Sequence, residues 1–180
     1  STRLNHLVEN LLNMSRLESG HLSPRPDWCD VHDLVNKVSG TLKQELSQFK
    51  FIQEIPEDMP LVYIDFGLME QVLHNLILNA TQYAPEGTTI TISFKYDKAG
   101  ILTVKVMDSG GGFSLSELNL LFNKFYRGEK TSSGGTGLGL SIVKGFVEAL
   151  GGSVSAGNLE GGGAVISIEI PVKITEMKEN

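Results

Sequence analysis

The sequence predicts an α+β fold, a two-layer sandwich in which one mixed sheet carries helices on one face. Strands and helices follow one another in a mixed rather than an alternating order, which is typical of this class. Residues 66–84 have the apolar spacing of a helix, and residues 88–96 and 101–107 read as long strands joined by an Asp-Lys-Ala-Gly turn. The chain of 180 residues is long enough for one domain with a full core and a short appendage.

The N-terminal segment, residues 1–22, has the pattern of an amphipathic helix that ends near Gly20. The sequence opens abruptly inside this pattern, so we expect a piece of a longer protein. Two interpretations stay open: a helix that packs on its own domain, and half of a helical hairpin whose partner helix is missing. The apolar positions with heptad-like spacing are Leu4, Leu7, Leu11 and Met14, and Val8 and Leu12 widen the stripe.

The segment before the main helix is built from short elements. Two prolines flank the approach to a short strand around Trp28, and Asp30 is expected to cap a helix that runs to about Gln48. Short strands at residues 51–55 and 61–64 lie on either side of a proline-marked turn.

A line of carboxamide side chains runs along the helix at residues 66–84, nearly opposite its apolar face. Asparagine is a poor helix former, so two asparagines one turn apart need a reason. One alternative is a solvated face; the other is a ligand site, because an amide oxygen is a hard ligand suited to Mg²⁺. The carboxamide line consists of Gln71, Asn75, Asn79 and Gln82. The apolar face consists of Met69, Val72, Leu73, Leu76, Ala80, Tyr83 and Ala84.

Asp108 directly follows a hydrophobic strand and begins a glycine-rich stretch, Asp-Ser-Gly-Gly-Gly. A carboxylate at a strand end accepts a hydrogen bond from an exocyclic amine such as that of adenine. The glycines that follow let a flat ring approach the backbone. A plain turn is the alternative, because Asp-Ser-Gly alone is weak evidence.

A second glycine-rich stretch, Gly134-Gly-Thr-Gly-Leu-Gly-Leu, opens a helix expected at about residues 136–150. Glycines before a helix expose backbone N–H groups, and a helix N-terminus favours phosphate. The stretch is neither a Walker P-loop, since no Gly-Lys-Ser/Thr follows, nor a Rossmann fingerprint, since no strand leads directly into it. A simple helix-capping loop is the alternative.

The rest of the second half is a long loop and two closing strands. Residues 109–135 form a span of the length typical of lids, and it carries three cations on an acidic chain. Such cations can meet phosphates as a lid closes. Strands are expected at about residues 153–157 and 164–171, and the polar tail 173–180 is expected to fray. The lid cations are Lys124, Arg127 and Lys130, and its apolar anchors are Phe122 and Phe125.

The composition excludes several classes of protein. The formal net charge of −6 argues against a nucleic-acid partner, which needs a basic face to displace counterions. Cys29 is the only cysteine, so the chain has no internal disulfide or cysteine-based zinc site, and a reducing compartment is expected. No stretch has the apolar length needed to span a bilayer, so we expect no membrane contact by this piece.

The motifs, taken in order, resemble those of the sensor histidine kinases of two-component systems. Each is moderately specific alone, but the set in this order with a lid inside it is highly specific. Asn75-Leu-Ile-Leu-Asn79-Ala resembles the N box, Asp108-Ser-Gly-Gly-Gly112 the G1 box, Phe122-Asn-Lys-Phe125-Tyr-Arg127-Gly the F box, and Gly135-Thr-Gly137-Leu-Gly139-Leu the G2 box.

The resemblance covers nearly the whole chain. Residues 27–172 resemble the ATP-binding catalytic domain with its Bergerat-type (GHKL) nucleotide fold. Residues 1–22 resemble the second helix of the dimerisation and histidine-phosphotransfer hairpin. The pieces LVENLLNMSRLESG and QYAPEGTTI resemble the potassium-sensing, KdpD-type kinases.

The family binds ATP with Mg²⁺, and the resemblance implies a role for each matching residue. Asn79 would ligate the Mg²⁺ that bridges the ATP phosphates, Asn75 would support it nearby, and Asp108 would bind the adenine amine. Arg127 would contact phosphate from the lid together with Lys124, and the implied catalytic residues are Asn75, Asn79 and Arg127. Tyr83 would pack against the nucleotide, Gly110 and Gly112 would give the ring room, and Gly135, Thr136, Gly137, Leu138 and Gly139 would shape the phosphate cradle.

Three functions compete for this set of motifs. The first is a kinase domain that gives the γ-phosphoryl group to a histidine. The second is an ATPase of the same fold, as in type II topoisomerases and Hsp90-type chaperones, which carry a water-activating Glu where this chain has Asn75. The third is a nucleotide-binding module without catalysis; Gln82, where many members carry Lys or Arg, is the hint for it. An imidazole is itself a good nucleophile, so a site without a base favours the first.

The resemblance also implies that none of the four histidines is the phosphoacceptor. The family's acceptor precedes an acidic residue on the first hairpin helix. His32 does precede Asp33, but an acidic residue is expected there because the first turn of a helix favours negative charge. His6 lies on the segment that matches the second hairpin helix, and His74 is expected to be peripheral. The implied partners are the histidine-bearing hairpin of the dimeric parent and a response regulator. The implied location is a cytoplasmic domain of a membrane protein.

Overall fold

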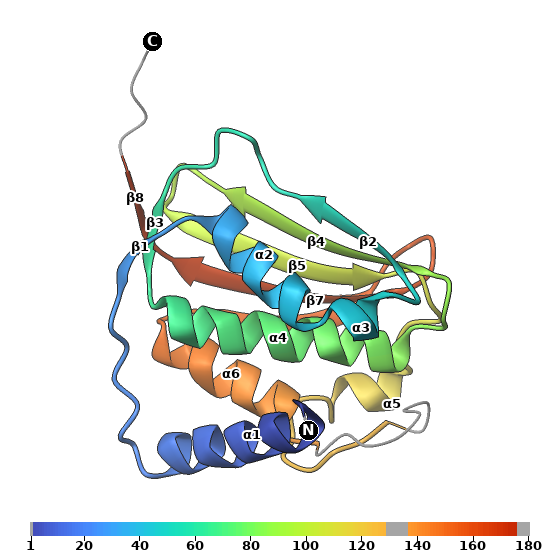
Figure 1. Ribbon diagram of the computed structural model, residues 1–180. Helices are drawn as coiled ribbons and strands as arrows, with labels where there is room; N and C mark the ends of the chain where they lie inside the picture. Colours follow the sequence, from blue (N-terminus) through green and yellow to red (C-terminus); the bar gives the residue numbers. More distant parts are fainter. Residues whose placement is uncertain (1, 129–136, 176–180) are drawn as a thin grey trace.

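The structure is a computed structural model that describes residues 2–128 and 137–175. Its main sheet and a layer of helices on one face of it form a two-layer sandwich, as predicted (Figure 1). The strands of this sheet, in their order across it, are β2 (Lys50–Glu54), β4 (Thr89–Tyr96), β5 (Ile101–Asp108), β7 (Ala164–Pro171) and β6 (Ser153–Asn158).

The sheet is mixed. β2 pairs parallel with β4, whereas β4 with β5, β5 with β7 and β7 with β6 are antiparallel. Burial alternates along β5 and β7, as expected for strands with one face on a core. In the pairing of β4 with β5, Ile90 lies opposite Asp108, the last residue of β5. The register therefore places this carboxylate at the end of the central strand of the sheet.

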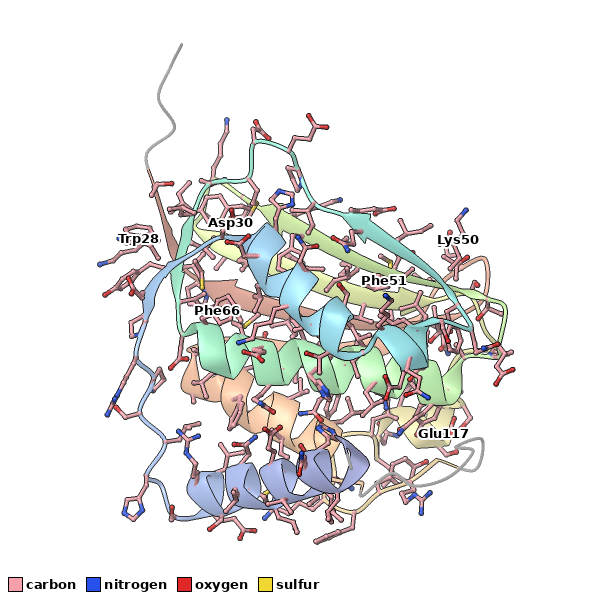
Figure 2. All side chains as sticks on the ribbon, in the orientation of Figure 1. Trp28, Asp30, Lys50, Phe51, Phe66 and Glu117 are labelled. Atoms are coloured by element: carbon pink, nitrogen blue, oxygen red, sulfur yellow. The ribbon has the colours of Figure 1, made fainter. Side chains whose placement is uncertain are left out.

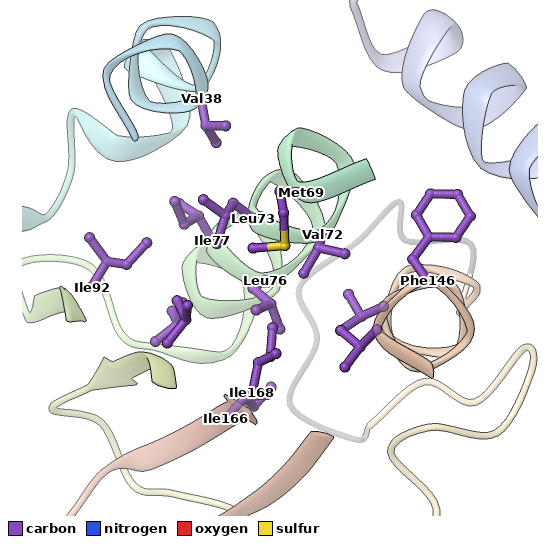
Figure 3. Packing of buried hydrophobic residues seen from close by; sticks show 14 of the residues in the cluster. Val38, Met69, Val72, Leu73, Leu76, Ile77, Ile92, Phe146, Ile166 and Ile168 are labelled. Atoms are coloured by element: carbon purple, nitrogen blue, oxygen red, sulfur yellow. The ribbon is translucent and has the colours of Figure 1, made fainter. Parts of the chain in front are cut away.

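The helices that cover the sheet are α2 (Val31–Thr41), α4 (Phe66–Tyr83) and α6 (Gly139–Ala149). Figure 1 shows α4 between the other two. The apolar residues of α4 recur three and four positions apart, so they form one face, and this face packs on the sheet. Figure 3 shows Leu76 of α4 pointing toward Ile166 and Ile168 of β7.

Aspartates begin two of these helices as the sequence predicts. Asp65 accepts a hydrogen bond from the Leu68 N–H at 3.0 Å, and Asp30 accepts one from the His32 N–H at 2.8 Å. The helix expected to run from Asp30 to about Gln48 is interrupted. It consists of α2 and the short helix α3 (Lys43–Leu46), with a bend at the buried residue Leu42.

The expectation of a single sheet is wrong. A second sheet, in the order β1-β3-β8, is formed by β1 (Asp27–Cys29), β3 (Val62–Ile64) and β8 (Lys173–Ile174). The tail expected at residues 173–180 therefore begins inside the fold, and the Thr175 N–H also donates to Leu61 O at 3.1 Å. On this sheet Trp28 packs against Tyr63 with ring centroids 5.1 Å apart, and Figure 2 shows Trp28 at the outer side of the molecule.

The N-terminal helix α1 (Thr2–Glu18) lies along α6 (Figure 1). The face toward the domain is largely polar, and Leu17 on it packs against Gly145 of α6. Most of the predicted apolar stripe of α1 faces away from the domain, whereas Met14 of that stripe is buried in the core. The buried residues of α1 are Asn10, Asn13 and Met14, and its exposed hydrophobic residues are Leu4, Val8, Leu11 and Leu12.

Both interpretations of residues 1–22 thus keep support. The helix packs on its own domain, and it still presents an apolar stripe on its outer side. Within the part of the chain that the structure describes, no helix combines the length and the apolar character needed to cross a membrane.

Candidate functional site

Asn75 is the most deeply buried member of the carboxamide line on α4. Its side chain is 3% exposed, and its Nδ2 donates to Gln71 O at 3.0 Å. The solvated-face alternative is therefore wrong for this residue. Asn79, one turn further along α4, is half-buried and has no hydrogen-bond partner for its side chain within residues 2–128 and 137–175.

The N-terminus of α6 meets α4 at Asn75. A Cβ on Gly139, the first residue of α6, would lie 3.0 Å from Asn75 Oδ1. Within residues 2–128 and 137–175, no side-chain cap is present at this helix end, where Leu138 is the N-cap residue and supplies no polar side chain for its first N–H groups. Free N–H groups and the helix dipole together make such an end suitable for an anion.

Asp108, the last residue of β5, is held in a fixed orientation. The carboxylate is 7% exposed, and its Oδ1 accepts from the Gly110 N–H at 2.9 Å and from the Ala164 N–H at 3.4 Å. Oδ2 has no partner among the residues that the structure describes. Oδ1 thus anchors the side chain at the end of β5.

The glycines after Asp108 are required by the protein's own packing. A Cβ on Gly110 would lie 2.9 Å from Pro85 Cδ. Gly112 has a φ of +77°, and a Cβ there would lie 2.5 Å from Asn158 Oδ1. Close neighbours within the chain are therefore sufficient to explain why glycine occupies these two positions, without a nucleotide ring beside them.

Tyr83 joins the end of α4 to the end of the F box. Its Oη accepts a hydrogen bond from the Gly128 N–H at 3.1 Å, and its ring meets Phe113 edge-on with centroids 5.4 Å apart. Burial raises the pKa of Tyr83, although the Gly128 N–H lowers it. The phenol therefore stays neutral and fixes the chain just before residue 129.

Glu117 belongs to this corner and was not singled out from the sequence. It lies on α5 (Leu115–Leu118), inside the span expected to be a loop, and Figure 2 shows it below the end of α4. The Ser114 side chain accepts from the Glu117 N–H, and Glu117 accepts from the Ser114 N–H at 2.8 Å. The pattern Ser-x-x-Glu is a capping-box signature, and that signal predicts this helix.

The F box and the G2 box also meet. The Phe125 N–H donates to Gly137 O at 2.8 Å, and both residues have positive φ angles, 63° and 73°. A Cβ on Gly137 would collide with the Phe125 backbone, at 2.5 Å from its carbonyl carbon. Glycine is needed at this position because the two loops touch here.

The lid cations are only partly described. Lys124 forms a salt bridge with Glu18 of α1, and Arg127 is exposed. Gly135 and Thr136 of the expected phosphate cradle, and Lys130 of the lid, lie outside the described residues. Leu138 is buried directly before α6.

Gln82 lies at a depression that Tyr83 also lines. It lines a cavity of about 560 Å³ together with Gln44, Gln48 and Glu86, between α3 and the C-terminal end of α4.

Comparison with known proteins identifies the family of this chain. The family described as "Histidine kinase-, DNA gyrase B-, and HSP90-like ATPase" matches residues 65–174. The sensor protein KdpD of Clostridium acetobutylicum is 35% identical over 171 residues, which is 93% of this chain and 19% of that protein. The sensor histidine kinase WalK of Bacillus subtilis is 33% identical over 176 residues, which is 95% of this chain and 29% of that protein.

A solved structure supports the fold. Full-length ShkA in complex with AMPPNP has a TM-score of 0.83 and is 24% identical, and the likeness covers 98% of this chain and 37% of that protein. This chain therefore belongs to the histidine kinase-, DNA gyrase B- and HSP90-like ATPase family, as an ATP-binding catalytic domain of the sensor histidine kinase type. It spans 19% and 29% of the length of the two relatives named here.

Proposed function

We propose that this domain transfers the γ-phosphoryl group of Mg·ATP to a histidine on a helical hairpin of its parent protein. The observation that carries the proposal is the contact of Asn75 with the N-terminus of α6. The anchored carboxylate of Asp108 at the end of β5 supports it. A metal-supporting amide, a phosphate-binding helix end and an amine acceptor are the parts that a nucleotide site of this family requires.

Asp108 supports recognition of the adenine. Its Oδ1 is used by the Gly110 N–H, so Oδ2 is the oxygen that accepts from the exocyclic amine. Tyr83 and the glycines at 110 and 112 form the neighbouring wall in this proposal. The relative ShkA was solved with AMPPNP, which supports a nucleotide in a fold of this shape.

The phosphates are proposed to lie at the start of α6. Its first N–H groups and dipole favour negative charge there, and the preceding cradle residues belong to the same site in this proposal. Asn79 offers one hard oxygen, which suits a Mg²⁺ ion that takes its other ligands from phosphates and water. Asn75 supports Asn79 and is not itself a metal ligand. The proposed cradle residues are Gly135, Thr136, Gly137, Leu138 and Gly139, and the proposed lid contacts are Lys124 and Arg127.

The absence of a base at position 75 supports transfer rather than hydrolysis. Asn75 is a neutral amide whose nitrogen is bound to Gln71 O, so it has no basic atom with which to activate water. A histidine acceptor needs no such activation, because a neutral imidazole is a nucleophile at neutral pH. Catalysis then rests on positioning and on electrostatic stabilisation of the transferred group.

The partners in this proposal lie outside the chain. Residues 1–22 act as the second helix of the hairpin, and the exposed stripe of α1 meets the first helix, which bears the phosphoacceptor. The parent relays the phosphoryl group to a response regulator, and it is a membrane protein whose cytoplasmic side holds this domain.

Transfer in trans tests the function directly. The chain is incubated with radiolabelled Mg·ATP, alone and with a separately produced hairpin from the KdpD of Clostridium acetobutylicum. We expect an acid-labile label on the hairpin and none on this chain, and we expect Asn79→Ala to abolish the label because it removes the proposed Mg²⁺ ligand.

The controls separate the alternatives. A hairpin whose phosphoacceptor histidine is replaced by glutamine must stay unlabelled. Release of free phosphate without a labelled hairpin would support the ATPase alternative instead, and an acid-labile label on this chain would show that one of its own histidines is an acceptor.

A further inference from the structure

Two histidines meet where α1 packs on the catalytic domain. The rings of His6 on α1 and His74 on α4 have centroids 4.3 Å apart and are inclined by 39°. His6 Nε2 also lies 3.3 Å from Nδ2 of Asn10, one turn further along α1. The two histidines are far apart in the sequence, and neither has a role in the proposed nucleotide site.

The polar atoms of this contact are poorly satisfied. Nδ1 of His6, Nδ1 of His74 and Oδ1 of Asn10 are buried without a hydrogen-bond partner within the described part of the chain. Burying an unpaired polar group is unfavourable by about 1–3 kcal/mol. The contact between α1 and α4 is therefore stable only while both rings are uncharged, since a charged ring would be more costly still to bury.

The charges around the pair do not reverse this preference. Burial, and to a smaller extent the neighbouring His6, lower the pKa of His74 to about 4. Burial also lowers the pKa of His6, although Glu9 on α1, Asn75 on α4 and Glu45 on α3 each act to raise it. Both rings are thus neutral at neutral pH while α1 is docked.

The other end of α1 touches the lid region. Glu18 forms the salt bridge with Lys124 of the F box, and Asn13 Nδ2 donates to Gln71 Oε1 at 3.4 Å. Because Glu18 and His6 lie on one rigid helix, movement of the helix away from α4 also separates Glu18 from Lys124. The position of α1 is thereby linked to the availability of a lid cation.

We propose that the contact between His6 and His74 is a protonation-sensitive clasp that holds α1 on the catalytic domain, so that acidification releases α1 and frees Lys124 from Glu18. The inference concerns docking of the helix and does not depend on nucleotide binding or phosphoryl transfer.

The direction of the pH effect follows from the lowered pKa values. A histidine that binds its proton less tightly when docked stabilises the docked state above its ordinary pKa of 6.5, and this stabilisation is lost as the pH falls below that value. For His74 alone, docking at about pH 5.5 is expected to be weaker by up to about tenfold than at about pH 7.5.

Distance measurement between two spin labels tests the clasp. The labels are placed on exposed positions of the two helices by Ser15→Cys on α1 and Lys144→Cys on α6, in a chain that also carries Cys29→Ala. At about pH 7.5 we expect one short distance, and at about pH 5.5 we expect a growing population of longer distances as α1 leaves the domain.

Variants decide whether the histidines are responsible. The double substitution His6→Gln and His74→Gln is expected to remove the pH response, and either single substitution to reduce it. His21→Gln, at an exposed position after α1, is the matched control and is expected to keep the full response. Circular dichroism checks folding, and His6→Gln alone lies outside the catalytic domain, so at least this variant reports on docking in an intact fold.

Two results would overturn the proposal. One is a spin–spin distance in the unaltered histidine background that does not change between about pH 7.5 and 5.5. The other is a pH response of the same size in the double variant as in the His21→Gln control.

Discussion

Asn75 on α4 lies against Gly139, the first residue of α6, so closely that a Cβ on the glycine would be 3.0 Å from Asn75 Oδ1. The two residues are far apart in the sequence and belong to the N box and the G2 box. Their contact fixes the start of a phosphate-binding helix relative to the amide line that includes Asn79. Direct packing of α4 on α6 thus sets the distance in space between the N box and the G2 box.

Gly139→Ala tests this packing. Alanine is the better helix former by about 1 kcal/mol, so the substitution would stabilise an unconstrained helix. Here we expect no gain in the free energy of unfolding, because the new methyl group pushes against Asn75. We also expect nucleotide affinity to fall by about tenfold, which corresponds to ~1.4 kcal/mol. Urea unfolding and nucleotide titration measure the two effects.

Gly40→Ala is the matched control, since a Cβ on Gly40 of α2 meets no atom within 4 Å. Urea unfolding is expected to show a gain of about 0.5–1 kcal/mol for this variant and an unchanged nucleotide affinity. Equal stabilisation by both alanines would show that Gly139 is not constrained by Asn75.

Tyr83→Phe removes the acceptor of the Gly128 N–H and leaves the ring in place. We expect the free energy of unfolding to fall by about 1 kcal/mol and the Gly128 amide to exchange its hydrogen faster, because this hydrogen bond anchors Gly128 of the lid to the end of α4. Hydrogen exchange followed by NMR measures the amide. Tyr63→Phe, on the outer face of the small sheet, is the control and should change neither quantity.

The raised pKa of the Cys29 thiol provides a test of its burial in the core beside β3. Burial, together with Asp27, Asp65 and Asp30, raises the pKa of this thiol from 9.0 to about 11. Its neutral form therefore stabilises the fold below pH 9.0, and this contribution is lost as the pH rises toward about 11. A thiolate-specific reagent is expected to modify the folded chain far more slowly than the urea-unfolded chain at about pH 8.5. Equal rates would contradict the burial.

The main elements of the fold are predictable from the sequence because their signals are local. The apolar spacing of residues 66–84 identifies α4 to within one residue of its end, and alternation identifies β4 and β5 similarly well. The small sheet is not predictable in the same way. β8 is a strand only because β3, far earlier in the chain, supplies its partner, and its two residues carry no pattern of their own.

The same limit applies to the site. Asp108 and the carboxamide line follow from residue type and position on one element. The contact between Asn75 and Gly139 needs the packing of α4 on α6, and the ion pair of Lys124 with Glu18 needs the docked position of α1. The pattern of α1 predicts an apolar stripe, but it does not show that most of this stripe faces outward while Met14 is buried with Asn10 and Asn13 on the side of the domain.

Titration of a fluorescent ATP analogue tests the nucleotide site most directly, with and without Mg²⁺, on the unaltered chain and on Asp108→Asn. The asparagine keeps Oδ1 as acceptor for the Gly110 N–H, so the fold persists, but it replaces Oδ2 with an NH₂ group that cannot accept from adenine. We expect saturable binding that Mg²⁺ strengthens and that Asp108→Asn weakens by about tenfold or more. Binding that does not saturate, or that Asp108→Asn leaves unchanged, would contradict the assignment of this site.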